Sequence, residues 1–525
     1  MLKCINVGLQ FQTKKLYEEV NLQFSKGNIY GIIGANGAGK TTFIKILSGE
    51  IEPTSGSVIL DKNERLSVLK QNQSEYDEET VMRTVLLGHK RLVEIMDEKE
   101  ALYSKEEFSE DDGIKAAELE GEFAELNGWE AESDAATLLT GLGIPEDYHY
   151  ELMKNLDGKQ KVKVLLAQAL FGNPDILLLD EPTNNLDVKS IRWLENFLDS
   201  FDNTVLVVSH DRHFLNRVVT HICDVDYGKI TLFPGNYEYW YESSQLALKQ
   251  LKDVNKKAEQ KKKELEEFIA RFSANASKSR QATSRKKALE KLEIVDIKPS
   301  TRKYPFIEWK PDREVGNDIL IVENLSKPGL FENLSFTVRK NDKIGFISSN
   351  SLIPTTIFNI LAGLDDDYTG KFKWGVTTSL SYLPITNNEY FENDLNLIDW
   401  LRQYSSDENE TFIRGFLGRM LFSGDEPLKK SRVLSGGEKQ RAMMSRMMLS
   451  GSNVLFLDAP TNHLDLESIQ SLNKGMNRFP GNILFTSHDE EILESVGNRF
   501  IYFDPSGEII DRDMEYDEFS KKYFE

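Results

Sequence analysis

The chain has 525 residues, 40% of them hydrophobic, which is more than one domain usually holds. Its two cysteines exclude a disulfide framework and a cysteine-ligated metal site. No apolar run approaches the roughly 20 residues needed to span a bilayer, and no charged-then-apolar leader opens the sequence. We therefore expect two or three domains in a cytoplasmic protein with no membrane segment of its own.

The formal net charge of −21 is unevenly distributed. Residues 249–303 contain 17 Lys/Arg and 8 Asp/Glu, so this segment has a net charge of +9 and the rest of the chain has −30. Because nucleic acids are bound through their phosphates by Lys and Arg, the acidic remainder argues against such binding over most of the surface. A nucleic-acid contact is expected only in the basic segment.

The first informative motif is a glycine-rich loop. An apolar run at 29–33 predicts a buried strand, which leads into Gly34-Ala35-Asn36-Gly37-Ala38-Gly39-Lys40-Thr41. In such a loop, backbone N–H groups surround phosphate oxygens, the lysine reaches the outer phosphates, and the threonine hydroxyl can ligate Mg²⁺. We expect ATP and Mg²⁺ here, with nucleotide contacts from Phe11 as the adenine platform and from Gly34, Asn36, Gly37, Gly39, Lys40, Thr41 and Thr42.

Two further apolar runs, 176–179 and 205–208, predict strands that end in hydrolytic side chains. Asp180 would hold Mg²⁺ through water, and Glu181 would orient or deprotonate the attacking water. His210 follows the second run and could contact the γ-phosphate, while Gln71 could sense the metal. The expected catalytic residues are Lys40, Glu181 and His210, and the expected metal-site residues are Thr41, Gln71 and Asp180.

Helical patterns separate these strands. This alternation predicts α/β domains with largely parallel sheets, whose motifs lie at the carboxyl ends of the strands. One stretch, near 84–145, contains apolar residues at roughly helical spacing among many acids, and it predicts a helical arm. Whether the arm binds a partner or is only a solvated helical pair stays open.

The basic segment predicts a helical hairpin. Apolar residues from Leu248 to Phe272 precede a polar stretch at 273–284, after which an apolar pattern resumes at Ala288. From Arg271 to Lys287 there are six basic residues and no acid, which suits RNA phosphates. The candidate RNA-binding residues at this tip are Arg271, Lys278, Arg280 and Arg285.

The rest of the chain is an internal repeat with losses in its second copy. Lys40 corresponds to Pro354 with an offset of 314, whereas Asp180 and Asp458 differ by 278, so the first copy holds 36 extra residues between these points. Pro354 removes the lysine and a backbone donor. Ile385 stands at the position of Gln71, and Ala459 stands at that of Glu181.

These motifs, with Leu434-Ser435-Gly436-Gly437-Glu438 and the loops 184–187 and 462–465, resemble tandem ATP-binding cassettes. The resemblance implies an intramolecular cassette dimer, closed head to tail, in which each ATP lies between one P-loop and the other signature. The first composite site would add Ser435, Gly436 and Gly437 to the intact P-loop. The second would pair two degraded faces, since the other signature reads Leu156-Asp157-Gly158-Lys159-Gln160. We expect one hydrolytic site and one largely structural interface.

Two cassettes, an arm, a charged helical linker and no membrane segment resemble the ABC-F family of translation factors over nearly the whole chain. The run 271–285 and the pair Asn184-Asn185 are most similar to its YbiT-like branch. The resemblance implies a ribosome partner, with the linker tip in the tRNA exit site near rRNA and the peptidyl-tRNA. Members of the family usually keep both P-loops, so the loss of the second is a departure.

The expected organisation is a first α/β nucleotide-binding domain at 1–240 with the arm at about 84–145, a basic linker at 241–303, and a second α/β domain at 304–525. The favoured function is ATP hydrolysis at one composite site in an ABC-F protein that modulates translation. An ATPase subunit of a membrane exporter, an antibiotic-resistance ribosome protection factor and a non-catalytic scaffold remain alternatives. The basic hairpin between the fused cassettes weighs against the exporter.

Overall fold

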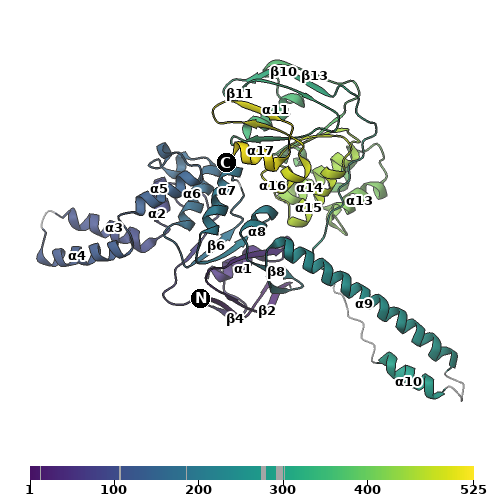
Figure 1. Cartoon of the computed structure of the whole chain (residues 1–525), viewed down its shortest axis with the longest axis horizontal. Coiled ribbons are helices and arrows are strands. Elements are labelled where there is room, and N and C mark those ends of the chain that lie inside the picture. Colours follow the sequence, from purple (N-terminus) through teal and green to yellow (C-terminus); the bar gives the residue numbers. More distant parts are fainter. Residues whose placement is uncertain are drawn as a thin grey trace.

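The computed structural model describes residues 1–11, 14–105, 108–184, 186–272, 279–290, 300 and 302–524; the side chains at 11, 14, 271, 272, 279–283 and 290 lie outside this description. Two α/β bodies pack against each other, and two helical projections extend from them in opposite directions (Figure 1). The C-terminus lies at the junction of the bodies, where the Arg192 guanidinium is 5.7 Å from the ring centroid of Phe524.

The first body is built on a six-stranded sheet in the order β5-β6-β7-β3-β8-β9, parallel except for β9. The three central strands are buried throughout because helices cover one face of the sheet, while α1 and the smaller sheet described next cover the other. A smaller antiparallel sheet has the order β2-β1-β4. The strands are β1 Leu2–Phe11, β2 Lys14–Phe24, β3 Ile29–Gly34, β4 Ser55–Ile59, β5 Leu66–Val68, β6 Ile176–Asp180, β7 Thr204–Val208, β8 His221–Asp226 and β9 Lys229–Pro234.

The helices of the first body include the arm, formed by α3 and α4, which projects to the left in Figure 1. Ion pairs such as Arg91–Glu122 and Lys99–Glu120, at 2.6 and 2.9 Å, join these two helices. The helices are α1 Lys40–Leu47, α2 Val81–Leu86, α3 Lys90–Tyr103, α4 Glu110–Glu125, α5 Ala131–Gly141, α6 Gly158–Leu170, α7 Val188–Asp199 and α8 Arg212–Val218, with short 3₁₀ turns at Glu146–Tyr148 and Met153–Asn155.

The second body repeats this plan, with sheets in the orders β14-β15-β16-β12-β17-β18 and β11-β10-β13. Its strands are β10 Leu320–Lys327, β11 Phe331–Val338, β12 Lys343–Ser348, β13 Thr369–Trp374, β14 Leu380–Leu383, β15 Val454–Leu457, β16 Asn482–Thr486, β17 Arg499–Phe503 and β18 Ile509–Arg512. Its helices are α11 Leu352–Leu361, α12 Leu397–Arg402, α13 Glu410–Arg419, α14 Gly436–Leu449, α15 Leu466–Arg478, α16 Glu490–Val496 and α17 Tyr516–Tyr523, with 3₁₀ turns at Asn388–Phe391, Glu426–Leu428 and Ser431–Val433.

The linker consists of α9, Tyr237–Phe272, and α10, Ser279–Glu290, which extend away from the junction of the bodies (Figure 1). The two helices touch where the Arg285 guanidinium lies 3.6 Å from the ring centroid of Phe268, a cation–π contact. Helix α10 begins at Ser279, inside the stretch expected to be a polar tip. The predicted apolar positions Leu292 and Val295 lie outside the described residues.

The fold class is therefore confirmed as two α/β bodies in tandem, with a helical arm in the first and a helical hairpin between them. The strands expected at 29–33, 176–179, 205–208 and in the second copy all form, since short runs of buried β-branched and leucine side chains suit a sheet covered on both faces. Within the described part of the chain, no helix is long and apolar enough to cross a membrane.

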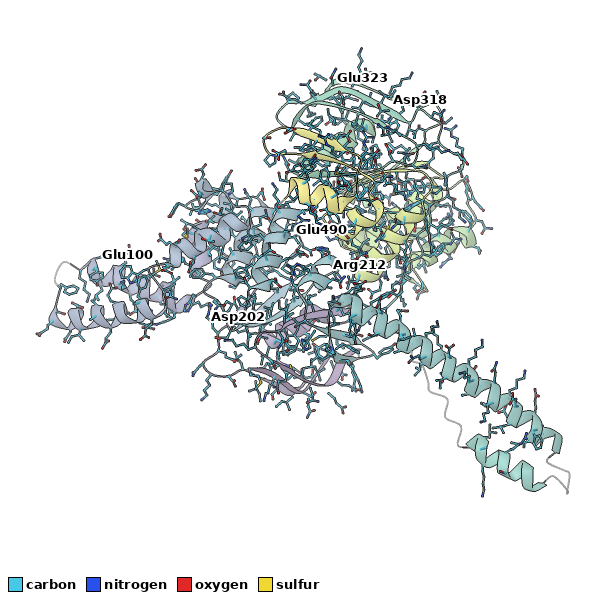
Figure 2. The ribbon with its side chains drawn as sticks, in the orientation of Figure 1. Glu100, Asp202, Arg212, Asp318, Glu323 and Glu490 are labelled. Atoms are coloured by element: carbon cyan, nitrogen blue, oxygen red, sulfur yellow. The ribbon has the colours of Figure 1, made fainter. Side chains whose placement is uncertain are left out.

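Charged side chains join the two bodies across their junction. Arg192 of α7 pairs with Glu490 at 3.0 Å, and Arg212 of α8 pairs with Glu491 at 2.7 Å. His213 also contacts Glu490, with 3.3 Å between Nε2 and Oε2. Figure 2 labels Arg212 of α8 and Glu490 of α16 at this junction. The bodies are thus held in contact by partly buried ion pairs.

Candidate nucleotide-hydrolysis site

The P-loop connects β3 to α1 and places Lys40 at the first turn of the helix. Gly37 and Gly39 have φ angles of 78° and 101°, a left-handed conformation that favours glycine. The Lys40 Nζ donates to the Gly34 carbonyl oxygen at 2.8 Å, and the side chain is buried. Burial lowers the pKa of this ammonium, while the nearby Glu181 opposes the shift.

Asp180 is the last residue of β6, at the carboxyl end of this strand. Its Oδ2 accepts a hydrogen bond from Gln71 Nε2 at 2.7 Å, and its buried Oδ1 has no hydrogen-bond partner among the described residues. Burial raises its pKa, and the side chains of Thr41 and Gln71 oppose this shift. Oxygen ligands of this kind suit Mg²⁺. Thr41, Gln71 and Asp180 therefore fit the metal, which would supply positive charge to neutralise the phosphates of the nucleotide.

Glu181 and His210 form a close pair at the ends of β6 and β7. The distance between His210 Nε2 and Glu181 Oε1 is 3.3 Å, and His210 N donates to Glu181 Oε2 at 3.3 Å. Removal from water raises the pKa of Glu181 to about 8 and lowers that of His210 to about 3. Glu181 also has a left-handed φ of 53°, a conformation that concentrates at functional sites. A carboxyl so perturbed suits a general base.

The P-loop, Glu181 and His210 face one cavity of about 810 Å³ between the two bodies. The first body contributes residues of the P-loop together with Glu181 and His210, and the second contributes Ser435, Gly436 and Gly437. Ser435 caps α14, where its N–H donates to Glu438 Oε2 at 2.8 Å. This helix N-terminus faces the cavity, and such termini favour phosphate. The structure thus brings together the P-loop and the signature that the sequence paired in trans.

Not every expected residue lines this cavity. Asn36, Gly37, Gly39, Lys40, Thr41 and Thr42 do, whereas Gly34, Gln71 and Asp180 are not on its wall, although Gln71 and Asp180 contact each other. Phe11 ends β1, and its side chain lies outside the described residues. Among the RNA candidates, only the Arg285 side chain is described; Lys278 and the side chains of Arg271 and Arg280 are not.

In the second body, the space at the positions that correspond to Lys40 and Glu181 is small. A cavity of about 30 Å³ is lined by Pro354, Ile385, Asp458 and Ala459 among others. Asp458 accepts hydrogen bonds from Thr355 Oγ1 at 2.6 Å and from Thr486 Oγ1 at 2.8 Å. Both oxygens of the carboxylate that corresponds to Asp180 are therefore already bound to protein.

A cleft of about 780 Å³ separates the remnant of the second P-loop from the degraded signature. Lys159 crosses this cleft, and its Nζ donates to Ser351 Oγ at 2.6 Å. Asp157 caps α6 with Gln160 by the same reciprocal pattern that Ser435 makes with Glu438. The backbone of the degraded signature is thus intact, but a lysine stands where the other signature has Gly437.

Several residues that line the first cavity were not among the predicted site residues, and Arg441, His463 and Asp489 are examples. The structure places His463 on the cavity wall, packed against Gly436 and Gly437. A Cβ at Gly437 would lie 2.7 Å from the His463 carbonyl oxygen. His463 belongs to the loop at 462–465, one of the motifs that resemble ATP-binding cassettes. That motif could have predicted a place for this residue near the nucleotide.

Comparisons with known proteins agree with this architecture. A family model described as ABC transporter matches residues 17–184 and 331–462, and a second model with the same description, ABC_tran_Xtn, matches 223–308. The chain belongs to the ABC transporter family. Its arm, its linker and its fused cassettes place it in the tandem ABC-F type, as the sequence predicted.

Two relatives each align with 99% of this chain. It is 61% identical to the ABC transporter ATP-binding protein YkpA of Bacillus subtilis over 99% of its length and 97% of that protein's. It is 43% identical to the probable ATP-binding protein YbiT of Escherichia coli O157:H7, over 99% of both chains. The structure titled RNase-L Inhibitor shares its fold, with a TM-score of 0.64, 17% identity and coverage of 99% and 92%.

A second solved structure has the same tandem fold. It is a complex of the archaeal ribosomal stalk protein aP1 with the archaeal ribosome recycling factor aABCE1, with a TM-score of 0.63, 18% identity and coverage of 99% of this chain and 92% of that one. Cassettes of this family bind ATP, usually with Mg²⁺, and hydrolyse it.

The perturbed pKa of Glu181 predicts how ATP turnover depends on pH. Because this pKa is raised to about 8, the carboxyl is protonated at neutral pH and becomes a base as the pH rises through that value. Since kcat/KM reports ionisations of the free enzyme, it should increase between about pH 7 and pH 9. The measurement is steady-state hydrolysis across this range, and a flat profile would contradict a base with a raised pKa.

Proposed function

We propose that this chain is an ATP-hydrolysing ABC-F protein that binds the ribosome and turns over ATP at the first composite site only. The supporting observation is the difference between the two sites. The first cavity holds a P-loop lysine, a carboxyl base and a serine-glycine signature, whereas the second interface, although its cleft measures about 780 Å³, has Pro354, Ala459 and Lys159 at the corresponding positions.

In the proposed mechanism, Lys40 and the P-loop N–H groups bind the phosphates, and Thr41 and Asp180 hold Mg²⁺ with Gln71. Glu181 accepts a proton from the attacking water, and His210 lies 3.3 Å away, near the expected γ-phosphate. Closure of Ser435, Gly436 and Gly437 over ATP completes the site. The second interface holds the cassettes together through contacts such as Lys159–Ser351.

The ribosome is proposed as the partner, with the linker tip near rRNA and the peptidyl-tRNA. Two structures of the same fold have titles that name a ribosome recycling factor and a ribosome-bound ABCE1, with TM-scores of 0.63 and 0.56. The exposed Arg285, together with Arg271, Lys278 and Arg280, suits RNA phosphates. This partner implies a cytoplasmic protein. We also propose the division into domains at 1–240, 241–303 and 304–525.

The test is co-sedimentation of Glu181→Gln with ribosomes. Without its base, the variant should bind ATP, fail to hydrolyse it and remain closed, so it should pellet with ribosomes in ATP and stay in the supernatant without it. ATP binding of the variant is measured in parallel by titration. If the variant binds ATP but does not pellet, the ribosome is not the partner, and a membrane or scaffold partner becomes the better explanation.

The contribution of the tip is measured in the same background. Adding Arg280→Glu and Arg285→Glu to Glu181→Gln should reduce ATP-dependent pelleting and its salt sensitivity, since each change replaces a phosphate-binding charge with a repelling one. Because Arg285 also contacts Phe268, Phe268→Leu, which keeps the charge of Arg285, serves as a control for loss of that contact alone. Undiminished pelleting of the two-glutamate variant would remove the tip from RNA binding.

A further inference from the structure

Arg302 is a buried arginine where the linker returns to the body of the molecule. Its side chain is 9% exposed and makes ion pairs with three carboxylates. Nε pairs with Glu467 at 3.0 Å, Nη1 pairs with Asp226 at 3.0 Å, and Nη2 pairs with Asp224. The planar guanidinium suits several fixed carboxylates at once, which a lysine cannot match.

These partners belong to different parts of the molecule. Asp224 and Asp226 lie on β8 of the first cassette, and Glu467 lies on α15 of the second. The first turn of α9, where the linker begins, packs at the same place. Its Trp240 has its ring centroid 4.8 Å from the Arg302 guanidinium. Ser300, two positions before Arg302, donates from its hydroxyl to Asp226 Oδ2 at 2.5 Å. One side chain therefore joins both cassettes and the linker.

Glu467 connects this junction to the ATP cavity. It lies in the first turn of α15, directly after the loop 462–465, in which His463 and Leu464 line the cavity. Asp465 caps the helix by accepting a hydrogen bond from Ser468 N at 2.9 Å. A shift of Glu467 would therefore move the cap and the loop with it. The Glu467 charge also acts on Lys40, where it opposes the lowering of the lysine pKa by burial.

The second interface has no equivalent of this connection among the described residues. By the offset of 278, Glu467 corresponds to Lys189, in the first turn of α7. Lys189 is exposed and has the opposite charge, whereas Glu467 is 5% exposed. The linker is thus tied to the loop that lines the complete site and not to the loop that faces the degraded one.

We infer that Arg302 is a positioning residue that couples the linker to the loop at 462–465, and hence the placement of the linker to hydrolysis in the first cavity. The inference rests on the proposed function, because it assumes that this cavity is the hydrolytic one. Helix α9 has 36 residues and would be about 54 Å long. A displacement of its far end would therefore be transmitted along this length to its first turn. Arg302 transmits that displacement because three buried carboxylates depend on it for charge compensation.

The test is Glu467→Gln, which removes one ion pair but leaves Arg302 with two carboxylates. Because the loop at 462–465 would lose the Glu467–Arg302 ion pair that connects it to the linker, kcat should fall by roughly tenfold. The Kd for ATP should stay within about twofold. Lys189→Gln is the matched control at the equivalent exposed position, and it should leave both values unchanged. All assays run well below the lowest melting temperature of the set, so unfolding does not enter the comparison.

Arg302→Lys tests the same contact from the linker side. It keeps the positive charge but loses the planar guanidinium that pairs with several carboxylates at once. It should also lower kcat, and combining it with Glu467→Gln should add little, as expected for two residues that act as one pair. Full additivity, or an unchanged kcat in Glu467→Gln, would overturn the inference. Lys40→Ala separates this failure from that of the proposed function: turnover that survives in Lys40→Ala means that the assigned cavity is wrong.

Discussion

Replacing Ser435 with arginine should lower ATP turnover by at least roughly a hundredfold, whereas Asp157→Arg should change it by less than about twofold. Ser435 caps the helix whose N-terminus faces the first cavity, so a long cation there would obstruct the space between signature and P-loop. Asp157 stands at the equivalent position of the second interface, opposite a P-loop that lacks its lysine. The measurement is steady-state hydrolysis at saturating ATP.

The two variants control for each other. Both residues cap a helix in a reciprocal pattern with the residue three positions later, so each substitution removes the same kind of cap, worth about 0.5–2 kcal/mol. Any loss of stability should therefore be shared, and melting temperatures recorded for both would show it. A difference in turnover isolates the role of the first signature, and an equal loss in both variants would contradict the one-site model.

Lys40→Ala should weaken ATP binding by roughly 10- to 100-fold, since charge-assisted hydrogen bonds contribute about 1.5–3 kcal/mol. The second P-loop cannot compensate, because Pro354 occupies the lysine position and also removes a backbone donor. Isothermal titration with ATP and Mg²⁺ measures the affinity directly. Pro354→Ala, at the equivalent position, should leave the affinity unchanged.

Two outcomes would contradict the assignment of Lys40. Appreciable hydrolysis in Lys40→Ala would show that the first cavity is not the active one. A parallel loss of affinity in Pro354→Ala would show that the second site binds nucleotide as well. Neither result is expected, since Asp458 is already bound by Thr355 and Thr486 on both of its oxygens.

Much of the fold could be predicted from local patterns. Short apolar runs such as 29–33 and 176–179 form central strands because parallel sheets are buried on both faces and need no alternation. The motifs at the ends of these runs then meet at one edge of the sheet, as the carboxyl ends of parallel strands do. Pro354 replaces the P-loop lysine and Ala459 replaces the carboxyl base, so the asymmetry between the two sites could also be predicted from the sequence.

Other features depend on contacts that no local pattern encodes. Helix α9 begins at Tyr237, within the expected first domain, because Tyr237 and Trp240 are buried in the core of that body. Residues 273–284 were expected to be a polar tip, yet α10 begins at Ser279. The domain boundaries stay predictions, as do the roles of Phe11 and of the basic tip.

The sequence alone determined which chemistry each half can perform, because the P-loop lysine, the base and the signature are properties of residue identity and spacing. Only the tertiary structure decided which side chains share an environment. The raised pKa of Glu181 follows from its removal from water between the cassettes, and the contact of Arg302 with Glu467 joins residues 165 positions apart. Both arise because folding brings distant, charged groups into one poorly solvated space, where each must be neutralised or paired.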